Sequence, residues 1–146
     1  MRKETKIFKC PICDTVVEVL ESCGLEMTCC GPEMVPLREN ICGKNDPHMP
    51  IIERMADGIR ISVGNPLHDM NADHCIAWIE VLADGMCYRQ FLRAGDKPQA
   101  MFKMDSRQPI VARVYCNSHG LWRAGDSTRG TKKARATAQE PQLACV

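Results

Sequence analysis

Ten of the 146 residues are cysteine, and this number most constrains what the chain can fold into. Cysteines at this density form disulfides in secreted proteins, or they bind metal where thiols stay reduced. The first ten residues are rich in lysine and arginine and contain no apolar run, so they do not predict a signal peptide. No segment approaches the roughly 18 consecutive apolar residues of a membrane span. We therefore expect a cytoplasmic protein whose cysteines bind metal.

The charge balance gives no reason to expect a strongly charged partner. Lysine and arginine number 19 and aspartate and glutamate 18, for a net charge of +1. This balance predicts neither nucleic-acid binding nor attachment to an anionic membrane. Aromatic residues make up only 5% of the chain, so we expect a core of isoleucine, valine, leucine and methionine.

Residues 1–39 are predicted to form a small metal-binding domain. Cys10 and Cys13 bracket a tight turn, residues 15–20 (TVVEVL) are typical of a short strand, and Cys29 and Cys30 lie in a second turn. A segment of this size buries little core and usually depends on a metal or disulfide. Residues 40–47 contain the asparagine, glycine and proline of a linker.

Residues 48–123 show the pattern of an all-β domain. Ile59, Ile61 and Val63 alternate with other residues, which places them on one face of a strand. Asp84-Gly85 is a hairpin signal. Short strands about a dozen residues apart predict a β-sandwich or barrel. Further strands are expected at 75–82, 86–92, 99–104 and 110–117.

The last segment, residues 124–146, has little to bury and contains a basic run at 131–135. Its glycine, proline, serine and threonine content predicts a disordered, solvated tail.

The four cysteines of the first domain can complete one tetrahedral site. Cys10 and Cys13 have the spacing of two ligands to one ion, and the adjacent pair Cys29 and Cys30 supplies two more sulfurs. Zinc and a single iron both suit four thiolates, and a purely structural zinc site is as compatible with the spacing as a redox site. Cys23 lies between the two pairs and could compete as a ligand.

All four histidines of the chain fall in the β domain, next to predicted loops: His48, His68, His74 and His119. One histidine alone would indicate a surface or core residue. Four of them at loop ends, with Cys116 three residues before His119, favour a shared metal ion.

Two stretches resemble a known family. The first domain, with Cys10-Pro11-Ile12-Cys13 and Cys29-Cys30-Gly31-Pro32-Glu33-Met34, resembles the desulforedoxin-type domain. The run from Tyr115 to Trp122 (YCNSHGLW), with His68, His74 and Trp78-Ile79-Glu80, resembles the neelaredoxin-like catalytic domain of superoxide reductases. Together they match the two-iron desulfoferrodoxin form over about residues 6–39 and 46–123.

The resemblance implies two iron ions and no organic cofactor. One would be a rubredoxin-like iron on Cys10, Cys13, Cys29 and Cys30. The other would be a catalytic iron with His48, His68, His74 and His119 as equatorial ligands and Cys116 as the axial thiolate. The implied fold is an immunoglobulin-like sandwich, usually dimeric. The implied reaction is the one-electron reduction of superoxide to hydrogen peroxide in the cytoplasm, with electrons from a rubredoxin-like donor.

The chain departs from the family immediately before the first ligand histidine. The family commonly has a glutamate and a lysine there, whereas this chain has Asp46 and Pro47. The glutamate can serve as a sixth iron ligand, so Asp46 is a candidate for that role, and Pro47 cannot replace the lysine that attracts superoxide. The cysteines left over are expected to be reduced thiols, with Cys75 and Cys87 in the core; the others are Cys23, Cys42 and Cys145.

A second function stays open at this point. If the histidines do not share an ion, the chain is a non-catalytic electron-transfer protein or a metal-stapled binding protein. Metal analysis together with the visible spectrum separates these functions, because only a reductase needs iron at the histidine site.

Overall fold

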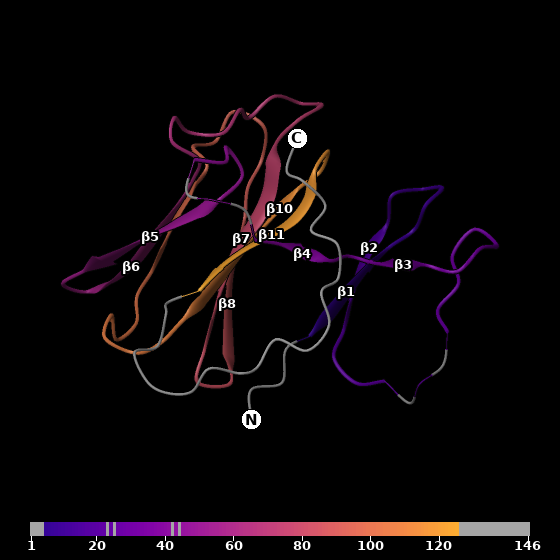
Figure 1. The fold of residues 1–146 in the computed structure, drawn as a ribbon, viewed down its shortest axis with the longest axis horizontal. Coiled ribbons are helices and arrows are strands. Elements are labelled where there is room, and N and C mark those ends of the chain that lie inside the picture. Colours follow the sequence, from indigo (N-terminus) through magenta and orange to yellow (C-terminus); the bar gives the residue numbers. More distant parts are fainter. Residues whose placement is uncertain (1–4, 23, 25, 42, 44, 126–146) are drawn as a thin grey trace.

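A computed structural model describes residues 5–22, 24, 26–41, 43 and 45–125. Within these ranges every regular element is a β-strand, which confirms the all-β prediction (Figure 1). The same residues include no helix with the length and apolar character needed to cross a membrane.

A small antiparallel sheet forms the N-terminal unit. It has the order β2-β1-β3, and Figure 1 shows it beside the larger part of the molecule. Its strands are β1 (Lys6–Lys9), β2 (Val16–Val19) and β3 (Val35–Pro36). The turn between β1 and β2 contains Cys10 and Cys13, and the segment before β3 contains Cys29 and Cys30.

The larger unit contains two sheets. The five-stranded sheet has the order β4-β11-β10-β7-β8, and the three-stranded sheet has the order β5-β6-β9. The first is made of β4 (Glu39–Asn40), β11 (Gly120–Gly125), β10 (Val111–Cys116), β7 (Ile76–Ala83) and β8 (Met86–Phe91). The second is made of β5 (Pro50–Met55), β6 (Gly58–Val63) and β9 (Gln99–Phe102).

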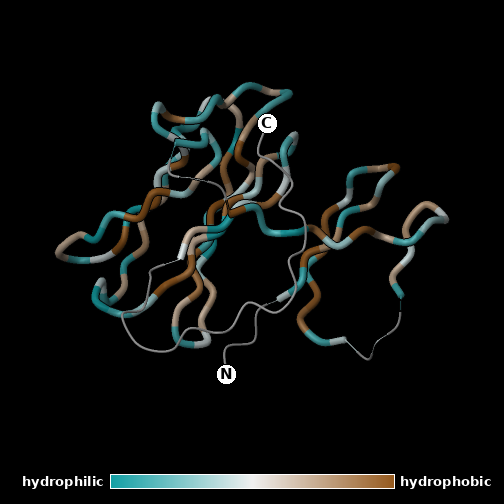
Figure 2. Tube along the Cα trace, viewed as in Figure 1, coloured by the Kyte–Doolittle hydropathy of each residue, from teal (hydrophilic) through white to brown (hydrophobic). Residues whose placement is uncertain are grey.

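The core lies between the two sheets of this sandwich. Ile59, Ile61 and Val63 of β6 are completely buried, as their alternation predicted, and they belong to one cluster with Ile79 and Val114 of the other sheet. Figure 2 shows hydrophobic stretches of the trace along the strands of both units and hydrophilic stretches mainly at the loops of the larger unit. Apolar burial of this kind is the main driving force for such a sandwich.

The predicted Asp84-Gly85 hairpin joins β7 to β8. Both residues have positive φ, 47° and 77°, which is the backbone that a tight two-residue turn between antiparallel strands requires.

Two expected boundaries fall inside strands. Asn40, expected in the linker, pairs with Trp122 because β4 runs parallel to β11. Ala124 and Gly125, expected in the tail, pair with Ala112 and Val111 of β10 and so extend the sandwich. The rest of the predicted tail, residues 126–146, lies outside the described residues.

The N-terminal unit packs against the five-stranded sheet through an apolar cluster. Ile7 of β1 is 3% exposed and belongs to one buried cluster with Trp78, Tyr115 and Leu121. These three residues come from β7, β10 and β11, so one side chain of the small sheet contacts the middle of the large one.

A buried ion-pair network lies beside this cluster. Arg113 of β10 is 2% exposed and is paired with the fully buried Glu80 of β7. Arg113 also donates hydrogen bonds to the backbone oxygen and hydroxyl of Thr5, at 3.1 and 3.2 Å. Arg89 of β8 joins Glu80 to Glu18 of β2, with 2.9 Å to the Glu18 carboxylate. Both charged and apolar contacts therefore hold the two units together.

Candidate metal centres

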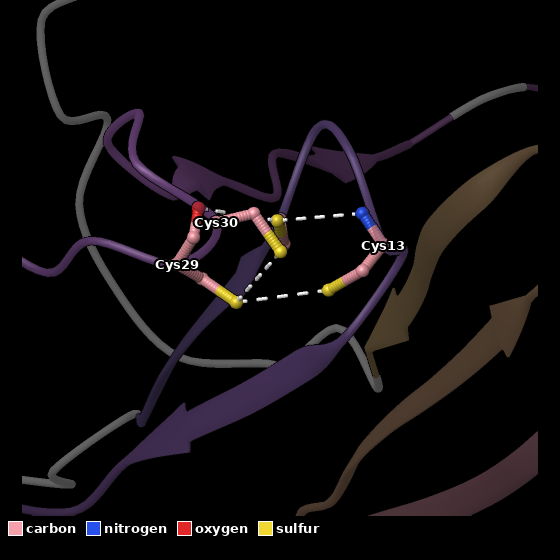
Figure 3. A group of neighbouring side chains, drawn as sticks. Cys13, Cys29 and Cys30 are labelled. Atoms are coloured by element: carbon pink, nitrogen blue, oxygen red, sulfur yellow. Dashed lines mark hydrogen bonds between the residues drawn. The ribbon is translucent and has the colours of Figure 1, made fainter.

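The four cysteines of the N-terminal unit converge as the sequence predicted. Their Sγ atoms all lie within 4.8 Å of one another. Cys13 Sγ is 3.6 Å from Cys29 Sγ, which is 3.9 Å from Cys30 Sγ. Figure 3 shows the three labelled side chains pointing toward one another from two turns. Four sulfurs at metal–sulfur bonds of about 2.3 Å would form a tetrahedron with edges of about 3.8 Å, so the donor set fits one tetrahedral ion.

The local backbone explains how adjacent cysteines can face the same point. Cys30 has a left-handed φ of 56°, and Gly31 follows with a φ of 103°. This reversal brings the sulfurs of Cys29 and Cys30 to the same side of the chain. On the opposite turn, the backbone amides of Ile12 and Cys13 lie 3.5 Å from Cys10 Sγ and can donate to a thiolate there.

Protonation of these thiols is uneven. Hydrogen bonds from Thr15, and from Cys10 and Cys29, lower the pKa of the exposed Cys13 thiol to about 6. A hydrogen bond from the Cys29 thiol to the Cys13 thiolate keeps Cys29 protonated and raises the pKa of Cys29 to about 12. A cation bound by the four sulfurs would displace such protons, so the cluster suits a metal ion.

The four histidines and Cys116 converge at one end of the sandwich. His48 precedes β5, His68 and His74 lie in the loop between β6 and β7, and Cys116 and His119 flank the β10–β11 turn. The ligand atoms of His48, His68, His74 and Cys116 lie within 4.8 Å of one another. His119 Nδ1 is 3.0 Å from both His48 Nε2 and His74 Nε2, so the fifth predicted residue belongs to the same group.

The imidazoles form a square. Ring centroids of neighbours are 4.8 Å apart for His48 and His68, 4.5 Å for His68 and His74, 4.8 Å for His74 and His119, and 4.6 Å for His119 and His48. The His48–His74 diagonal is 6.1 Å. With metal–nitrogen bonds of about 2.1 Å, ligands at right angles lie about 3.0 Å apart, as the facing nitrogens do here.

Cys116 supplies the remaining donor. Its Sγ is 3.7 Å from His68 Nε2 and 3.6 Å from His119 Nδ1, and the residue is completely buried. Burial raises the pKa of the Cys116 thiol, while hydrogen bonds from the backbone amides of Ser118 and His119 favour the thiolate. The donor set of four nitrogens and one sulfur therefore fits a redox metal such as iron.

Two of the rings are oriented by acceptors behind them. His48 Nδ1 is 3.0 Å from Asp46 Oδ1, and His68 Nδ1–H donates to the backbone oxygen of Asp69. Burial lowers the pKa of both imidazoles, so they stay neutral and can bind a cation. Their Nε2 atoms are left facing the centre of the square. Asp46, a candidate sixth ligand from the sequence, thus has its carboxylate on the outer edge of His48.

The square has a buried half and an exposed half. His48 and His68 are 9% and 6% exposed, whereas His119 and its neighbour Ser118 are exposed. A small anion and water can therefore approach from the His119 side.

Several contacts of the site were not predicted from the sequence. The Trp122 ring stacks on His48 with centroids 4.7 Å apart and an angle of 15°, and Trp122 Nε1–H donates to the His119 oxygen. Asn117 ties the β10–β11 turn to the start of β7, because its amide and side chain bond the backbone of Cys75. The motif from Tyr115 to Trp122 contained both residues, but spacing alone does not reveal their contacts.

The remaining cysteines take no part in either cluster, as far as the structure describes them. Cys75 is half-buried and Cys87 is exposed, so the expectation that they belong to the core was wrong. Cys87 lies on the edge strand β8, next to Tyr88, which packs against the core and contacts Phe102 of the second sheet. Because successive side chains of a strand point to opposite faces, Cys87 points away from this core, and its thiol lies 3.4 Å from the Glu80 carboxylate. Cys23, Cys42 and Cys145 lie outside the described residues.

Comparison with known proteins covers nearly the whole described chain. A family model described as Desulfoferrodoxin matches residues 40–125, and one described as Desulfoferrodoxin, N-terminal domain, matches residues 2–37. The desulfoferrodoxin of Nitratidesulfovibrio vulgaris is 42% identical over 125 residues, which are 85% of this chain and 98% of that protein. The desulfoferrodoxin of Syntrophotalea carbinolica is 43% identical over 123 residues, 84% of this chain and 97% of that protein.

A solved structure shares the fold. The crystal structure of the superoxide reductase from Treponema pallidum superposes with a TM-score of 0.68 at 20% identity, over 83% of this chain and 98% of that one.

Proposed function

Because the chain belongs to the desulfoferrodoxin family, we propose that it is a superoxide reductase, which reduces superoxide to hydrogen peroxide. The observation that carries this proposal is the square of four imidazoles closed by one buried thiolate. Structural zinc sites are almost always four-coordinate, whereas five donors from one chain leave a sixth position for a reacting ligand on an octahedral ion.

We assign the catalytic iron to His48, His68, His74, His119 and Cys116, and a second iron to Cys10, Cys13, Cys29 and Cys30. When bound at the histidine site, iron would supply one electron to superoxide, which takes up two protons and leaves as hydrogen peroxide. Asp46 is not included among the ligands, because its carboxylate binds the outer edge of His48.

The residues of the site prepare this reaction in three ways. Neutral imidazoles leave the charge of a bound cation largely uncompensated, so the site attracts the superoxide anion. The amides of Ser118 and His119 stabilise the Cys116 thiolate, the strongest electron donor among the five ligands. The exposed edge at His119 admits superoxide and lets water deliver protons.

Electron supply, assembly and location complete the proposal. The four-cysteine site resembles a rubredoxin centre in its donor set, and its Cys13 and Cys30 are exposed, which suits electron exchange with a rubredoxin-like protein. The chain is proposed to act as a homodimer in the cytoplasm, where its free thiols would stay reduced. The domain division at residues 1–39 and 48–123 likewise stays a prediction.

Substitution of Cys116 by serine tests the catalytic assignment. A serine hydroxyl is a far weaker electron donor, so Cys116→Ser should lower the second-order rate with superoxide, measured by pulse radiolysis, by at least about tenfold. The iron of the four-cysteine site, measured by its absorption, should be unchanged. Cys87→Ser, which alters an exposed cysteine outside both clusters, is the matched control and should keep the wild-type rate.

Two outcomes would contradict the proposal. An unchanged rate in Cys116→Ser would show that the thiolate is not the electron-donating ligand. Wild-type protein with iron at the four-cysteine site, no metal at the histidine site and no consumption of superoxide would instead support a non-catalytic electron-transfer protein.

A further inference from the structure

Asp46 binds His48 at two points. Its Oδ1 accepts hydrogen bonds from the His48 backbone amide at 2.9 Å and from His48 Nδ1 at 3.0 Å. Both side chains are largely buried, with 16% of Asp46 and 11% of His48 exposed. A carboxylate shielded from water to this degree makes a stronger hydrogen bond than one on the open surface.

The two nitrogens of His48 face in opposite directions. Nε2 points into the square, 3.0 Å from His119 Nδ1, whereas Nδ1 points to Asp46. The Trp122 ring covers one face of the same imidazole. Asp46 thus fixes one edge of the His48 ring, and Trp122 covers one of its faces. Nε2 is therefore the ring nitrogen that is available to bind a metal ion.

The backbone before His48 is shaped for this contact. A bond from an aspartate oxygen to the amide two residues later closes an Asx turn, and Pro47 fixes the φ of the residue between them. The Pro47 oxygen packs against Gly64, where a Cβ would lie only 2.4 Å from it. Gly64 also donates from its amide to the Met49 oxygen at 3.0 Å. The Asp46-Pro47 pair, which departs from the family pattern, is therefore held rigidly on both sides of the turn.

From these contacts, and resting on the proposed function, we propose that Asp46 is a positioning residue for the metal ligand His48. It holds the tautomer with the proton on Nδ1, aims Nε2 at the ion and makes that nitrogen a better donor. A carboxylate that binds the outer edge of His48 through Oδ1 is committed there, so this role replaces that of a sixth ligand. His68 obtains a similar contact from the backbone oxygen of Asp69, which does not depend on the side chain at that position.

Metal affinity in the absence of superoxide tests the proposal. Metal-free protein is titrated with Co²⁺ against a chelator, and the four-cysteine site, which absorbs more strongly because it has four thiolates, serves as the internal reference. Removal of a carboxylate behind a ligand histidine typically lowers affinity about 10- to 100-fold, and we expect this loss at the histidine site of Asp46→Ala. Asp46→Asn keeps an acceptor oxygen and should lose less.

Asp69→Ala is the matched control. It removes an equal charge from an exposed side chain beside another ligand, but it leaves the backbone oxygen that accepts from His68. Its Co²⁺ affinity should stay within about twofold of wild type, since a surface charge at this range contributes little. In the zinc-loaded protein, the Nδ1 proton of His48 should give a slowly exchanging NMR signal that is lost in Asp46→Ala and kept in Asp69→Ala.

Three results would overturn the proposal. The first is equal Co²⁺ affinity in Asp46→Ala and Asp69→Ala. The second is a His48 Nδ1 proton that stays protected in Asp46→Ala. The third is an unchanged affinity combined with an altered absorption spectrum of the oxidised iron protein, which would identify Asp46 as a sixth ligand. If the wild-type histidine site binds no Co²⁺ although the four-cysteine site does, the proposed function itself fails, and the role of Asp46 fails with it.

Discussion

Truncation of Ile7 to alanine should weaken the contact between the two units by about 3 kcal/mol. The change removes three buried carbon atoms, which at about 0.8 kcal/mol each give a transfer loss of about 2.4 kcal/mol. The cavity adds to this loss, and truncations of this kind in cores cost about 2 to 5 kcal/mol. Trp78 and Tyr115 are stacked on each other, with centroids 5.8 Å apart, so they cannot easily move to fill the space.

Urea unfolding of the zinc-loaded protein, followed by tryptophan fluorescence, measures this loss. The chain has two tryptophans, and both report on relevant places: Trp78 lies in the Ile7 cluster and Trp122 on His48. Ile41→Ala is the control, because Ile41 is 74% exposed. Exposed substitutions usually change stability by less than about 0.5 kcal/mol. If Ile7→Ala unfolds at the same urea concentration as Ile41→Ala, the two units do not pack through this cluster in solution.

Two further substitutions test the N-terminal unit. Cys13→Ser should abolish metal binding at the four-cysteine site, while the histidine site keeps its metal and much of its superoxide rate. Metal analysis and pulse radiolysis check these two expectations. Complete loss of activity with metal still bound at the histidine site would show that electrons must pass through the four-cysteine site. Hydrogen bonding to Arg89 holds the pKa of the Glu18 carboxyl below its usual value of about 4.3, so Glu18 stabilises the fold above that pH and loses this effect as the pH falls. Glu18→Gln should therefore lower the free energy of unfolding by about 1 to 2 kcal/mol at pH 7. In urea unfolding, this difference from wild type should shrink between about pH 5 and pH 3.5. A difference that does not depend on pH would contradict this account.

Local patterns predicted much of the sandwich. The alternation at Ile59, Ile61 and Val63 identified a strand with one buried face, because side chains of a strand point alternately to its two sides. Asp84-Gly85 identified a hairpin, because both residues tolerate the positive φ that the turn needs. These features depend only on neighbours in the sequence.

The contact between the two units could not be predicted in the same way. Arg113 and Glu80 look like ordinary solvent-facing charges within apolar strands, yet both are buried. The partners of Arg113 include Thr5, Glu18 and Glu39, which are far away in the sequence, and no local pattern encodes such pairs. The buried charges are tolerated because each is hydrogen-bonded to an opposite charge.

The candidate ligands were predictable, but their geometry was not. Spacing and resemblance identified the four histidines and Cys116 as candidate ligands, because all five lie in or next to loops of the β domain. They did not indicate that Nδ1 of His119 would face Nε2 of His48 and of His74. Likewise, Asp46 became a candidate sixth ligand because the family has a glutamate at this position, and a resemblance does not say which edge of His48 the carboxylate contacts.

Strand β10 connects the two halves of the molecule. Its alternation directs Arg113 and Tyr115 toward the N-terminal unit and Ala112, Val114 and Cys116 toward the sandwich core. The pairing with β7 shifts register between Tyr115 and Cys116, which is where the strand passes from the contact with Ile7 to the metal site. The shift passes over Ala77 of β7, while Cys116 stays paired with Ile76 and Gly120. The Cys116 sulfur faces His68 and His119, and Tyr115 stays packed on Trp78. Tyr115, which takes part in the contact between the two units, is thus directly followed by Cys116 of the metal site. The Ile7 and Cys116 substitutions therefore probe the two sides of a single strand.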